Sequence, residues 1–351
     1  KRSGGLYSLK VVYKGRIVNY IGSKFTLSSF LEESIKETLK ENNSKPLSEN
    51  IFCDLFMGTA AVSKIFKNQV NKIIANDKEY YSFVLAKNYI GNNKILKRKN
   101  QLIDLLNNLK PVKSKIFINY APSGGNERQY FSDYNAMKID AIRLKIEEWK
   151  NNQFINDNEY FFLLASLLES ADKVANTASV YGAFLKHIKK SAQKEIILKP
   201  AEFDCGNTKS VIFNEDANNI ITKIKGDILY LDPPYNSREY GANYHLLNTI
   251  ALYDNFTPKG KTGLREYEKS NWCKKDKVYR ELETLIKNAN FKFIFLSYND
   301  EGLLSLKQIK EIFESQGKYS LKNKTYKRFK ADNNRFNKKD ETIEYLHILI
   351  K

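Results

Sequence analysis

A carboxylate, a backbone carbonyl and an aromatic ring follow one short apolar run in residues 227–235. The run from Ile228 to Leu231 predicts a buried strand, which ends at Asp232-Pro233-Pro234-Tyr235 because the two prolines remove backbone donors and fix φ. Asp232 and the carbonyl of Pro233 can each accept one N–H, and Tyr235 can stack on a ring. This turn suits a flat amine attached to an aromatic ring, and the alternative is an ordinary strand followed by a Pro-Pro turn.

A second group of residues that could bind a ligand lies in Asp54-Leu-Phe56-Met-Gly58-Thr59, between a predicted strand and a predicted helix. Gly58 lets the backbone approach a ligand closely, and the start of the helix offers free N–H groups. Asp54 could accept a hydrogen bond from an ammonium group. Phosphate binding is disfavoured, because the segment lacks both the Gly-Lys-Ser/Thr of a P-loop and the second glycine of a dinucleotide fingerprint. A tight strand-to-helix turn is the alternative.

Two further acidic residues end predicted strands. Asp77 follows the strand at 72–76, about 20 residues after the glycine turn, which is a spacing typical of a carboxylate that binds ribose hydroxyls. Asp216 follows the strand at 210–213 and is placed to accept from an adenine amino group of the same ligand. The alternative for each is a helix N-cap, and for Asp216 considered alone this alternative is favoured.

The elements around these residues alternate between strands and helices, which predicts an α/β fold with a doubly wound, mostly parallel sheet. Strands are expected at 51–56, 72–76, 210–213, 228–231, 292–296 and 342–350, and helices at 26–42, 59–66 and 80–109. Residues 110–200 lack strand signals and show helical periodicity at 135–150 and 159–169. We therefore expect one sheet domain built from residues 1–109 and 201–351, with an inserted, mainly helical domain at 110–200.

The formal net charge of +18 predicts a polyanionic partner, and nucleic acid is the usual one. A Lys-rich, AT-biased proteome is the alternative source of this charge. The three cysteines and three histidines are scattered, which predicts no disulfide, no metal site and a reducing cytoplasm. No run reaches the roughly 20 apolar residues of a membrane span, and residues 1–5 lack the apolar region of a signal peptide.

The order of these motifs resembles that of the S-adenosylmethionine-dependent DNA adenine-N6 methyltransferases. More narrowly, the chain is similar to the Dam-like (alpha) group of restriction-modification type, in which a target-recognition domain precedes the catalytic motif. Tyr20-Ile-Gly-Ser-Lys24 resembles the N-terminal cofactor motif of this family, in which the Lys contacts the cofactor. Asp54 to Ser63 resembles its glycine motif, with Ala60 in place of the usual second glycine.

The resemblance implies a Rossmann-like methyltransferase sheet, the cofactor S-adenosyl-L-methionine and a double-stranded DNA substrate. The implied cofactor-binding residues are Tyr20, Lys24, Asp54, Phe56, Gly58, Thr59, Asp77 and Asp216. The implied catalytic residues are Asp232, Pro233, Pro234 and Tyr235. Asp at the first position of this motif is typical of the adenine enzymes, whereas Ser there is typical of the cytosine-N4 enzymes.

An amine inside a duplex can react only after its base is flipped out, and Tyr235 is expected to stack on that base. The insertion is expected to read the DNA sequence. The residues expected to contact DNA are Arg128, Asn176, Tyr181, Lys186, His187, Lys189, Lys190 and Lys194 in the insertion, Arg238 beside the catalytic turn, and Lys327 and Arg328 in a basic tail. The alternative is a solvated helix face for the charged residues of the insertion, and an edge hairpin with a basic solvent face for the tail.

We expect a monomer or weak dimer, with a separately acting restriction endonuclease as the second partner that the resemblance implies. Three other functions are compatible with the motifs. Adenine in RNA and a glutamine amide offer a similar planar amine, but the large basic insertion favours duplex DNA. A regulator that binds nucleic acid without catalysis is the third, and the intact Asp232 and Tyr235 argue against it.

Overall fold

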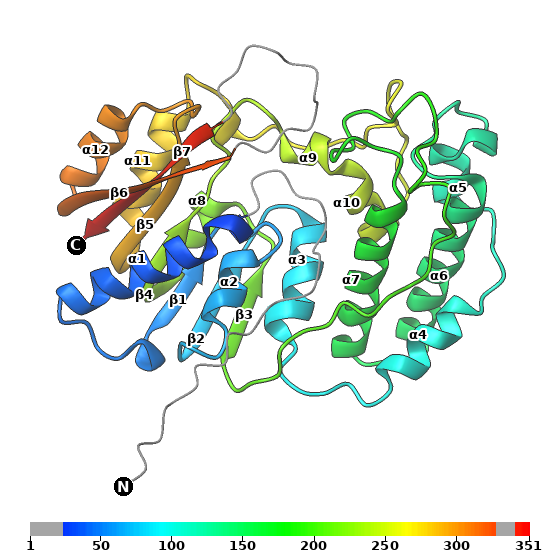
Figure 1. The fold of residues 1–351 in the computed structure, drawn as a ribbon, viewed down its shortest axis with the longest axis horizontal. Helices are drawn as coiled ribbons and strands as arrows, with labels where there is room; N and C mark the ends of the chain where they lie inside the picture. The colour runs from blue at the N-terminus through cyan, green and yellow to red at the C-terminus, as the bar shows by residue number, and fades with distance from the viewer. Residues whose placement is uncertain (1–23, 328–340) are drawn as a thin grey trace, which may run out of the picture.

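The structure, a computed structural model, describes residues 24–327 and 341–351. Its centre is a sheet with the strand order β3-β2-β1-β4-β5-β7-β6 (Figure 1). The strands are β1 Ile51–Asp54, β2 Lys72–Asn76, β3 Lys209–Phe213, β4 Lys225–Leu231, β5 Asn290–Asn299, β6 Lys318–Lys327 and β7 Glu341–Ile350. Neighbours from β3 to β5 are parallel, and β7 is antiparallel to both β5 and β6. The predicted doubly wound, mostly parallel α/β sheet is confirmed.

Both faces of the sheet are buried, because alternate residues of a strand point to opposite sides. Phe52 and Ile228 belong to one hydrophobic cluster, whereas their neighbours Cys53 and Leu229 belong to a second. The helices that supply the two clusters are α1 Ser28–Glu41, α2 Ala61–Phe66, α3 Tyr80–Ala86, α4 Lys99–Asn107, α5 Lys115–Tyr120, α6 Asp133–Asn151, α7 Asp157–Val174, α8 Ala217–Ile220, α9 Tyr240–Asn243, α10 His245–Leu252, α11 Val278–Asn288 and α12 Leu306–Glu314.

The helix expected at 80–109 is interrupted. After α3 the chain forms a π-helical turn, Lys87–Gly91, and an irregular connection to α4. The carbonyls freed by this break accept hydrogen bonds from a buried cation, because Lys67 Nζ donates to Tyr89 O at 2.7 Å and to Asn92 O at 2.6 Å. Periodicity alone did not reveal the break, since the stabilising cation comes from another part of the sequence.

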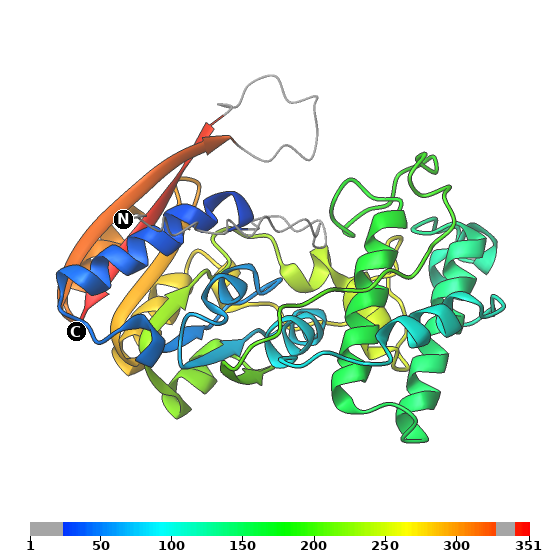
Figure 2. The ribbon, with the colours of Figure 1, turned by 60° about the horizontal axis from the view of Figure 1, so that its bottom comes forward.

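The long connection between β2 and β3 contains α3 to α7 and no strand of the sheet. Figures 1 and 2 show α4 to α7 gathered at the opposite end of the molecule from α11, α12 and the β6–β7 pair. The interior of this helical part is continuous with that of the sheet, because Leu164 of α7 and Leu85 of α3 lie in the same hydrophobic cluster. The three-segment division at 110 and 200 therefore stays a prediction. Among the described residues, no helix has both the length and the hydropathy to cross a bilayer.

Candidate active site

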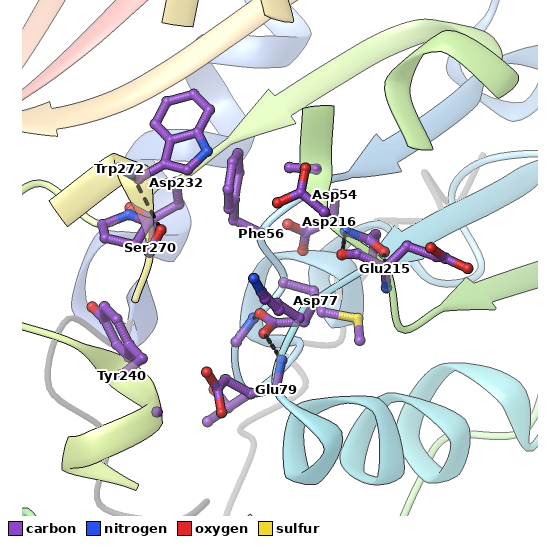
Figure 3. Close-up of a pocket in the computed structure, with 18 of the residues that line it drawn as sticks. Asp54, Phe56, Asp77, Glu79, Glu215, Asp216, Asp232, Tyr240, Ser270 and Trp272 are labelled. Carbon is purple, nitrogen blue, oxygen red and sulfur yellow. Dashed lines mark hydrogen bonds between the residues drawn. The ribbon is translucent and has the colours of Figure 1, made fainter. Parts of the chain in front are cut away.

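Four loops meet at the carboxyl ends of β1, β2, β3 and β4. The order of the strands reverses between β1 and β4, and open α/β sheets bind ligands beside such a reversal. One pocket lies here, and Figure 3 shows acidic and aromatic side chains around it. The predicted site residues that line it are Lys24, Asp54, Phe56, Gly58, Thr59, Asp77, Asp216, Asp232 and Pro234. The topology thus brings together nearly every predicted cofactor residue; Tyr20 lies outside the described residues.

The turn after β1 carries the backbone into the pocket. Gly58 has a φ of 51° and Ala60 a φ of 60°, both in the left-handed region that favours glycine. Ala60 therefore adopts a conformation that costs about 1–2 kcal/mol for an L-residue. The turn is also tied to the neighbouring strand, because Gly58 N donates to Asp77 Oδ2 at 2.8 Å. The position where a second glycine is usual has kept a glycine-like backbone.

Asp54 presents a free acceptor to the pocket. Its Oδ2 accepts from Ser63 Oγ at 2.7 Å and from Ser63 N at 3.2 Å, so α2 holds the carboxylate in place. Its Oδ1 is buried and has no hydrogen-bond partner among the described residues. Burial raises the pKa of Asp54 to about 7, against the effect of Ser63. A cationic donor that reached Oδ1 would satisfy this atom, which fits the predicted contact with an ammonium group.

Asp77 and Glu79 form the acidic wall after β2. The other oxygen of Asp77 accepts from Glu79 N at 2.9 Å, and burial raises the pKa of Asp77 to about 6. Glu79 also lines the pocket and accepts from Asn248 of α10. Burial raises the pKa of Glu79 to about 7, with the charge of Asp77 adding to the shift. Sequence reasoning missed Glu79, although its position two residues after a strand-end Asp was the available signal.

Asp216 has two roles in the geometry. Its side chain caps α8 by accepting from Asn218 N at 2.9 Å and from Asn219 N at 3.3 Å, so the N-cap interpretation is confirmed. Asp216 also lines the pocket. The two interpretations are therefore compatible, and the predicted contact with an adenine amino group stays a prediction.

The segment after α10 also contributes to the lining of the pocket. Ser270, Trp272 and Cys273 line the pocket, and the Trp272 ring meets Phe56 edge to face with centroids 5.1 Å apart (Figure 3). Ser270 N donates to Glu239 Oε2 at 3.0 Å, which joins this segment to the loop after the catalytic turn. Sequence reasoning did not predict these lining residues, because residues 255–277 contain no periodic pattern.

Asp232 lies at the end of β4, beside a buried cation. Lys24 Nζ is 3.1 Å from Asp232 Oδ1 and 2.6 Å from Glu344 Oε1 of β7. Burial raises the pKa of Asp232 to about 6, although Lys24 lowers it. Burial alone would lower the pKa of Lys24, but the two carboxylates raise it well above its usual range. Lys24 thus lies at the site as expected, and its partners in the chain are Asp232 and Glu344, a glutamate that sequence reasoning missed.

The rest of the turn at 232–235 is held in place by neighbouring segments. Pro233 is buried, and the carbonyl of Tyr235 accepts from Leu303 N at 2.8 Å. The Tyr235 ring is partly buried and meets Tyr298 edge to face, with centroids 6.4 Å apart. Contacts with β5 and the loop before α12 therefore fix the direction of the turn.

The structure corrects three of the predicted DNA contacts, because their side chains are buried and bonded within the protein. Arg128 donates to the carbonyls of Asn119, Gly260 and Lys261. Asn176 is fully buried and bonds to Gln129 O and Leu185 O. Tyr181 is also fully buried, and its hydroxyl donates to Asp172 Oδ1 at 2.7 Å. The charge and hydrogen-bonding capacity of these side chains suggested DNA contacts, but the side chains form hydrogen bonds within the protein.

The other predicted DNA contacts have different surroundings. Lys189 is partly buried and donates to Thr177 O at 2.6 Å. The exposed ones are Lys186, His187, Lys190, Lys194 and Arg238. Arg328 and the side chain of Lys327 lie outside the described residues. The burial that excludes Arg128 as a DNA contact does not apply to the exposed cations. Their contact with DNA stays a prediction.

Replacing Arg128 with Met is expected to lower stability rather than to act first on DNA binding. The substitution removes a buried guanidinium from three carbonyls, and hydrogen bonds to charged groups contribute roughly 1.5–3 kcal/mol each. We expect a loss of about 3 kcal/mol or more in the free energy of unfolding, because three such bonds are lost together. Urea denaturation measures it, with the exposed Lys186→Met as the matched control. Equal stabilities of the two variants would refute the assignment.

The family model for D12 class N6 adenine-specific DNA methyltransferases matches residues 20–327. The chain belongs to this family. The methyltransferase is 56% identical over 336 residues to the Type II methyltransferase M.NlaIII of Neisseria lactamica, covering 95% of this chain and 99% of that protein. It is 37% identical to the Type II methyltransferase M.CviAII of Paramecium bursaria Chlorella virus 1, covering 90% and 93% of the two chains. It is 39% identical to the Type II methyltransferase M.FokI of Planomicrobium okeanokoites, of which it spans 53%.

The methyltransferase is therefore an enzyme that acts on DNA, and its methyl donor is S-adenosyl-L-methionine. The pocket fits this donor, which carries a sulfonium and an ammonium group. Among the charged residues of the lining, carboxylates outnumber lysines, and Asp54 Oδ1, which has no hydrogen-bond partner among the described residues, can accept from the ammonium group. Phe56 and Trp272 add an aromatic wall suited to a flat purine.

Donor binding is expected to weaken as the pH falls. Burial holds the pKa of both Asp54 and Glu79 at about 7, and a cationic ligand binds their ionised forms. Binding below about pH 7 must therefore release protons, with affinity falling up to about tenfold per pH unit for each group that must ionise. Calorimetric titration in two buffers of different ionisation enthalpy measures the release. The Asp54→Asn variant should release fewer protons, and equal release from both proteins would contradict this assignment.

Proposed function

We propose that the methyltransferase flips an adenine out of duplex DNA and holds its amino group at Asp232 and the Pro233 carbonyl during methyl transfer. The observation that carries the proposal is the position of Asp232. Its carboxylate lines the same pocket as Asp54 and Asp77, which are the residues suited to the donor. The two substrates of the reaction would then meet in one buried space at the ends of adjacent strands.

The amino nitrogen of adenine is a poor nucleophile, because its lone pair is conjugated with the ring. The donor supplies a methyl group on a sulfonium. Acceptors at Asp232 and Pro233 would hold the two N–H groups and favour a pyramidal nitrogen with an available lone pair. Positive charge grows on nitrogen as the new bond forms, and a fixed carboxylate stabilises that charge without reorganisation. The proton that the nitrogen loses can pass to Asp232, so no earlier deprotonation is needed.

Ion pairing supports the assignment of Asp232 as an acceptor. Lys24 contacts Asp232 through Oδ1, at 3.1 Å, which leaves Oδ2 for an amino group. A carboxylate with a pKa of about 6 is mainly ionised at neutral pH and still close enough to that pH to take up a proton. Tyr235 is proposed as the stacking surface for the flipped base, a contact worth on the order of 1–3 kcal/mol.

Exposed cations of the segment 182–194 are proposed to contact the DNA backbone. Lys186, Lys190 and Lys194 are exposed, and they lie between α7 and β3. Each lysine that neutralises a phosphate releases counterions, so binding depends steeply on salt.

The double variant Lys186→Gln and Lys190→Gln is expected to bind DNA with a smaller salt dependence. The slope of log affinity against log salt should fall by about 0.9 for each lost phosphate contact. Fluorescence anisotropy with a labelled duplex measures the slope. The distant pair Lys307→Gln and Lys310→Gln on α12, which removes the same charge, should leave the slope unchanged. A slope that stays the same in both double variants would exclude Lys186 and Lys190 from the interface.

The relatives are Type II methyltransferases, which supports a role in restriction-modification. We propose that the enzyme protects a host sequence in the cytoplasm against a separately acting restriction endonuclease, and that it works as a monomer or weak dimer. A methyltransferase of this role must act on duplex DNA at one sequence.

The test is methyl transfer from labelled S-adenosyl-L-methionine to duplex DNA, single-stranded RNA and protein side by side, followed by sequencing of the methylated bases. We expect N6-methyladenine at one recognition sequence in the duplex. Transfer to RNA or protein at an equal or higher rate would refute the proposed substrate.

A further inference from the structure

Glu344 is buried in β7 and points at the catalytic end of β4. Its side chain is 1% exposed, and Oε1 contacts Lys24 Nζ at 2.6 Å. β7 lies next to β5 rather than next to β4, so Glu344 reaches the site across a strand. The charge of a buried carboxylate is costly unless it is paired. Burial of Glu344 therefore depends on Lys24, and the question is what Glu344 does for the site.

Lys24 is shared unequally between two carboxylates. The contact with Glu344 is 2.6 Å, whereas the contact with Asp232 is 3.1 Å. An ammonium group that pairs with a single carboxylate neutralises the charge of that carboxylate and fixes its position. With Glu344 present, the three side chains carry one net negative charge, and the shorter contact keeps Lys24 on the side of β7. Asp232 retains negative charge and an oxygen that has no part in the ion pair.

We propose that Glu344 is a positioning residue for methyl transfer: it anchors the Lys24 ammonium and thereby keeps Asp232 available as an anionic acceptor for the amino group of adenine. This inference rests on the proposed function of Asp232. Glu344 acts through Lys24 and need not touch either substrate. The third neighbour of the pair is Tyr326 of β6, whose hydroxyl lies 3.4 Å from Glu344 Oε2.

The groups that face Asp232 determine how the acid limb of the pH–rate profile responds. Burial raises the pKa of Asp232, Lys24 lowers it and Glu344 raises it. The other titratable groups that interact with Asp232 are Asp54, Tyr230, Tyr235, Tyr240 and Tyr326. Removing the charge of Glu344 therefore lowers the pKa of Asp232 and leaves it more tightly paired with Lys24. The acid limb should move to lower pH while the plateau rate falls.

The experiment compares Glu344→Gln with the wild type in single-turnover methylation of duplex DNA over about pH 5 to 9. The substitution is nearly isosteric and removes only the charge. We expect the rate at the plateau to fall on the order of 10-fold to 100-fold, as for a catalytic group displaced by about 1 Å, with little change in donor affinity. The control is Glu341→Gln, an exposed glutamate three residues earlier in β7 that loses the same charge. It should match the wild type.

Two outcomes decide the proposal. An acid limb that moves to lower pH in Glu344→Gln but not in Glu341→Gln supports it, since a purely structural role would lower stability without moving the limb. An unmoved limb overturns it.

Glu344→Asp provides a second variant if Glu344→Gln does not fold. It keeps the charge, so a lower rate with the limb in place is expected, and a shifted limb would count against the proposal. If Asp232→Ala stays active, the proposed function fails; if Asp232→Ala is inactive while the limb of Glu344→Gln is unmoved, only this inference fails.

Discussion

Replacing Asp232 with Ala is expected to abolish methyl transfer while leaving the protein folded and able to bind DNA. The Asp232 side chain is 19% exposed at the carboxyl end of β4, so truncating it to Ala leaves only a small cavity. The substitution removes the acceptor that would stabilise positive charge on the amino nitrogen. Loss of one such preorganised group costs on the order of 10²–10³ in rate, and the catalytic acceptor should lie at the upper end. Single-turnover transfer to duplex DNA measures the loss.

Two controls separate this loss from indirect effects. Asp227→Ala removes an acidic residue near the other end of β4, which bonds to Ile51 N and Lys45 and does not line the pocket, and should retain transfer. Binding of S-adenosyl-L-methionine and of DNA by Asp232→Ala should stay within a few-fold of wild type. A variant without Asp232 that turns over at near wild-type rates would remove the proposed mechanism altogether.

Replacing Lys24 with Met is expected to destabilise the protein by about 3 kcal/mol or more, because removing one member of a buried ion pair leaves an uncompensated charge. Lys24 is 6% exposed and is the cation between Asp232 and Glu344. Thermal or urea unfolding measures the loss. Adding Glu344→Gln to Lys24→Met should recover part of the stability, because the double variant buries one carboxylate fewer. A double variant less stable than Lys24→Met alone would contradict this pairing.

The stability deficit of Lys24→Met should depend on pH in a defined direction. Without Lys24, the folded-state pKa of Asp232 rises above the value of about 6 that it has in the wild type. A carboxyl whose folded-state pKa is raised holds more protons in the folded state, so its cost is present at high pH and disappears as the pH falls through that pKa. The deficit should therefore be largest near pH 8 and shrink toward about pH 5. A deficit that grows on acidification would show that Lys24 does not compensate buried carboxylates.

Much of the sheet and half of its pocket could be predicted from the sequence, because both depend on local patterns. Ile51 to Asp54 and Lys72 to Asn76 are short apolar runs that end in a polar residue, and the structure has strands at both. In a parallel sheet such residues must meet at one edge. Asp54, Asp77 and Asp232 were therefore found without any knowledge of their contacts.

The remainder depends on contacts between distant segments, which periodicity does not report. Trp272 lies in a short 3₁₀ helix, Asn271–Cys273, that only tertiary packing brings to Phe56. Glu344 looked like one polar residue in an apolar strand, and only its 2.6 Å contact with Lys24 reveals its place at the site. Arg128 shows the opposite error, because a cation in a basic insertion was assigned to DNA although three carbonyls in the protein surround it.

The position of Arg128 has a consequence for exchanging specificity between relatives. Arg128 joins the helical part to the tight turn at Gly260 and Lys261, and Tyr120 adds a 2.7 Å hydrogen bond to Gly263 O. A chimera that transplants residues 110–200 alone would cut these bonds and loosen the segment that leads on to Trp272. On the proposed role of residues 110–200 in reading DNA, an exchange should therefore take the turn at 259–264 from the same donor protein.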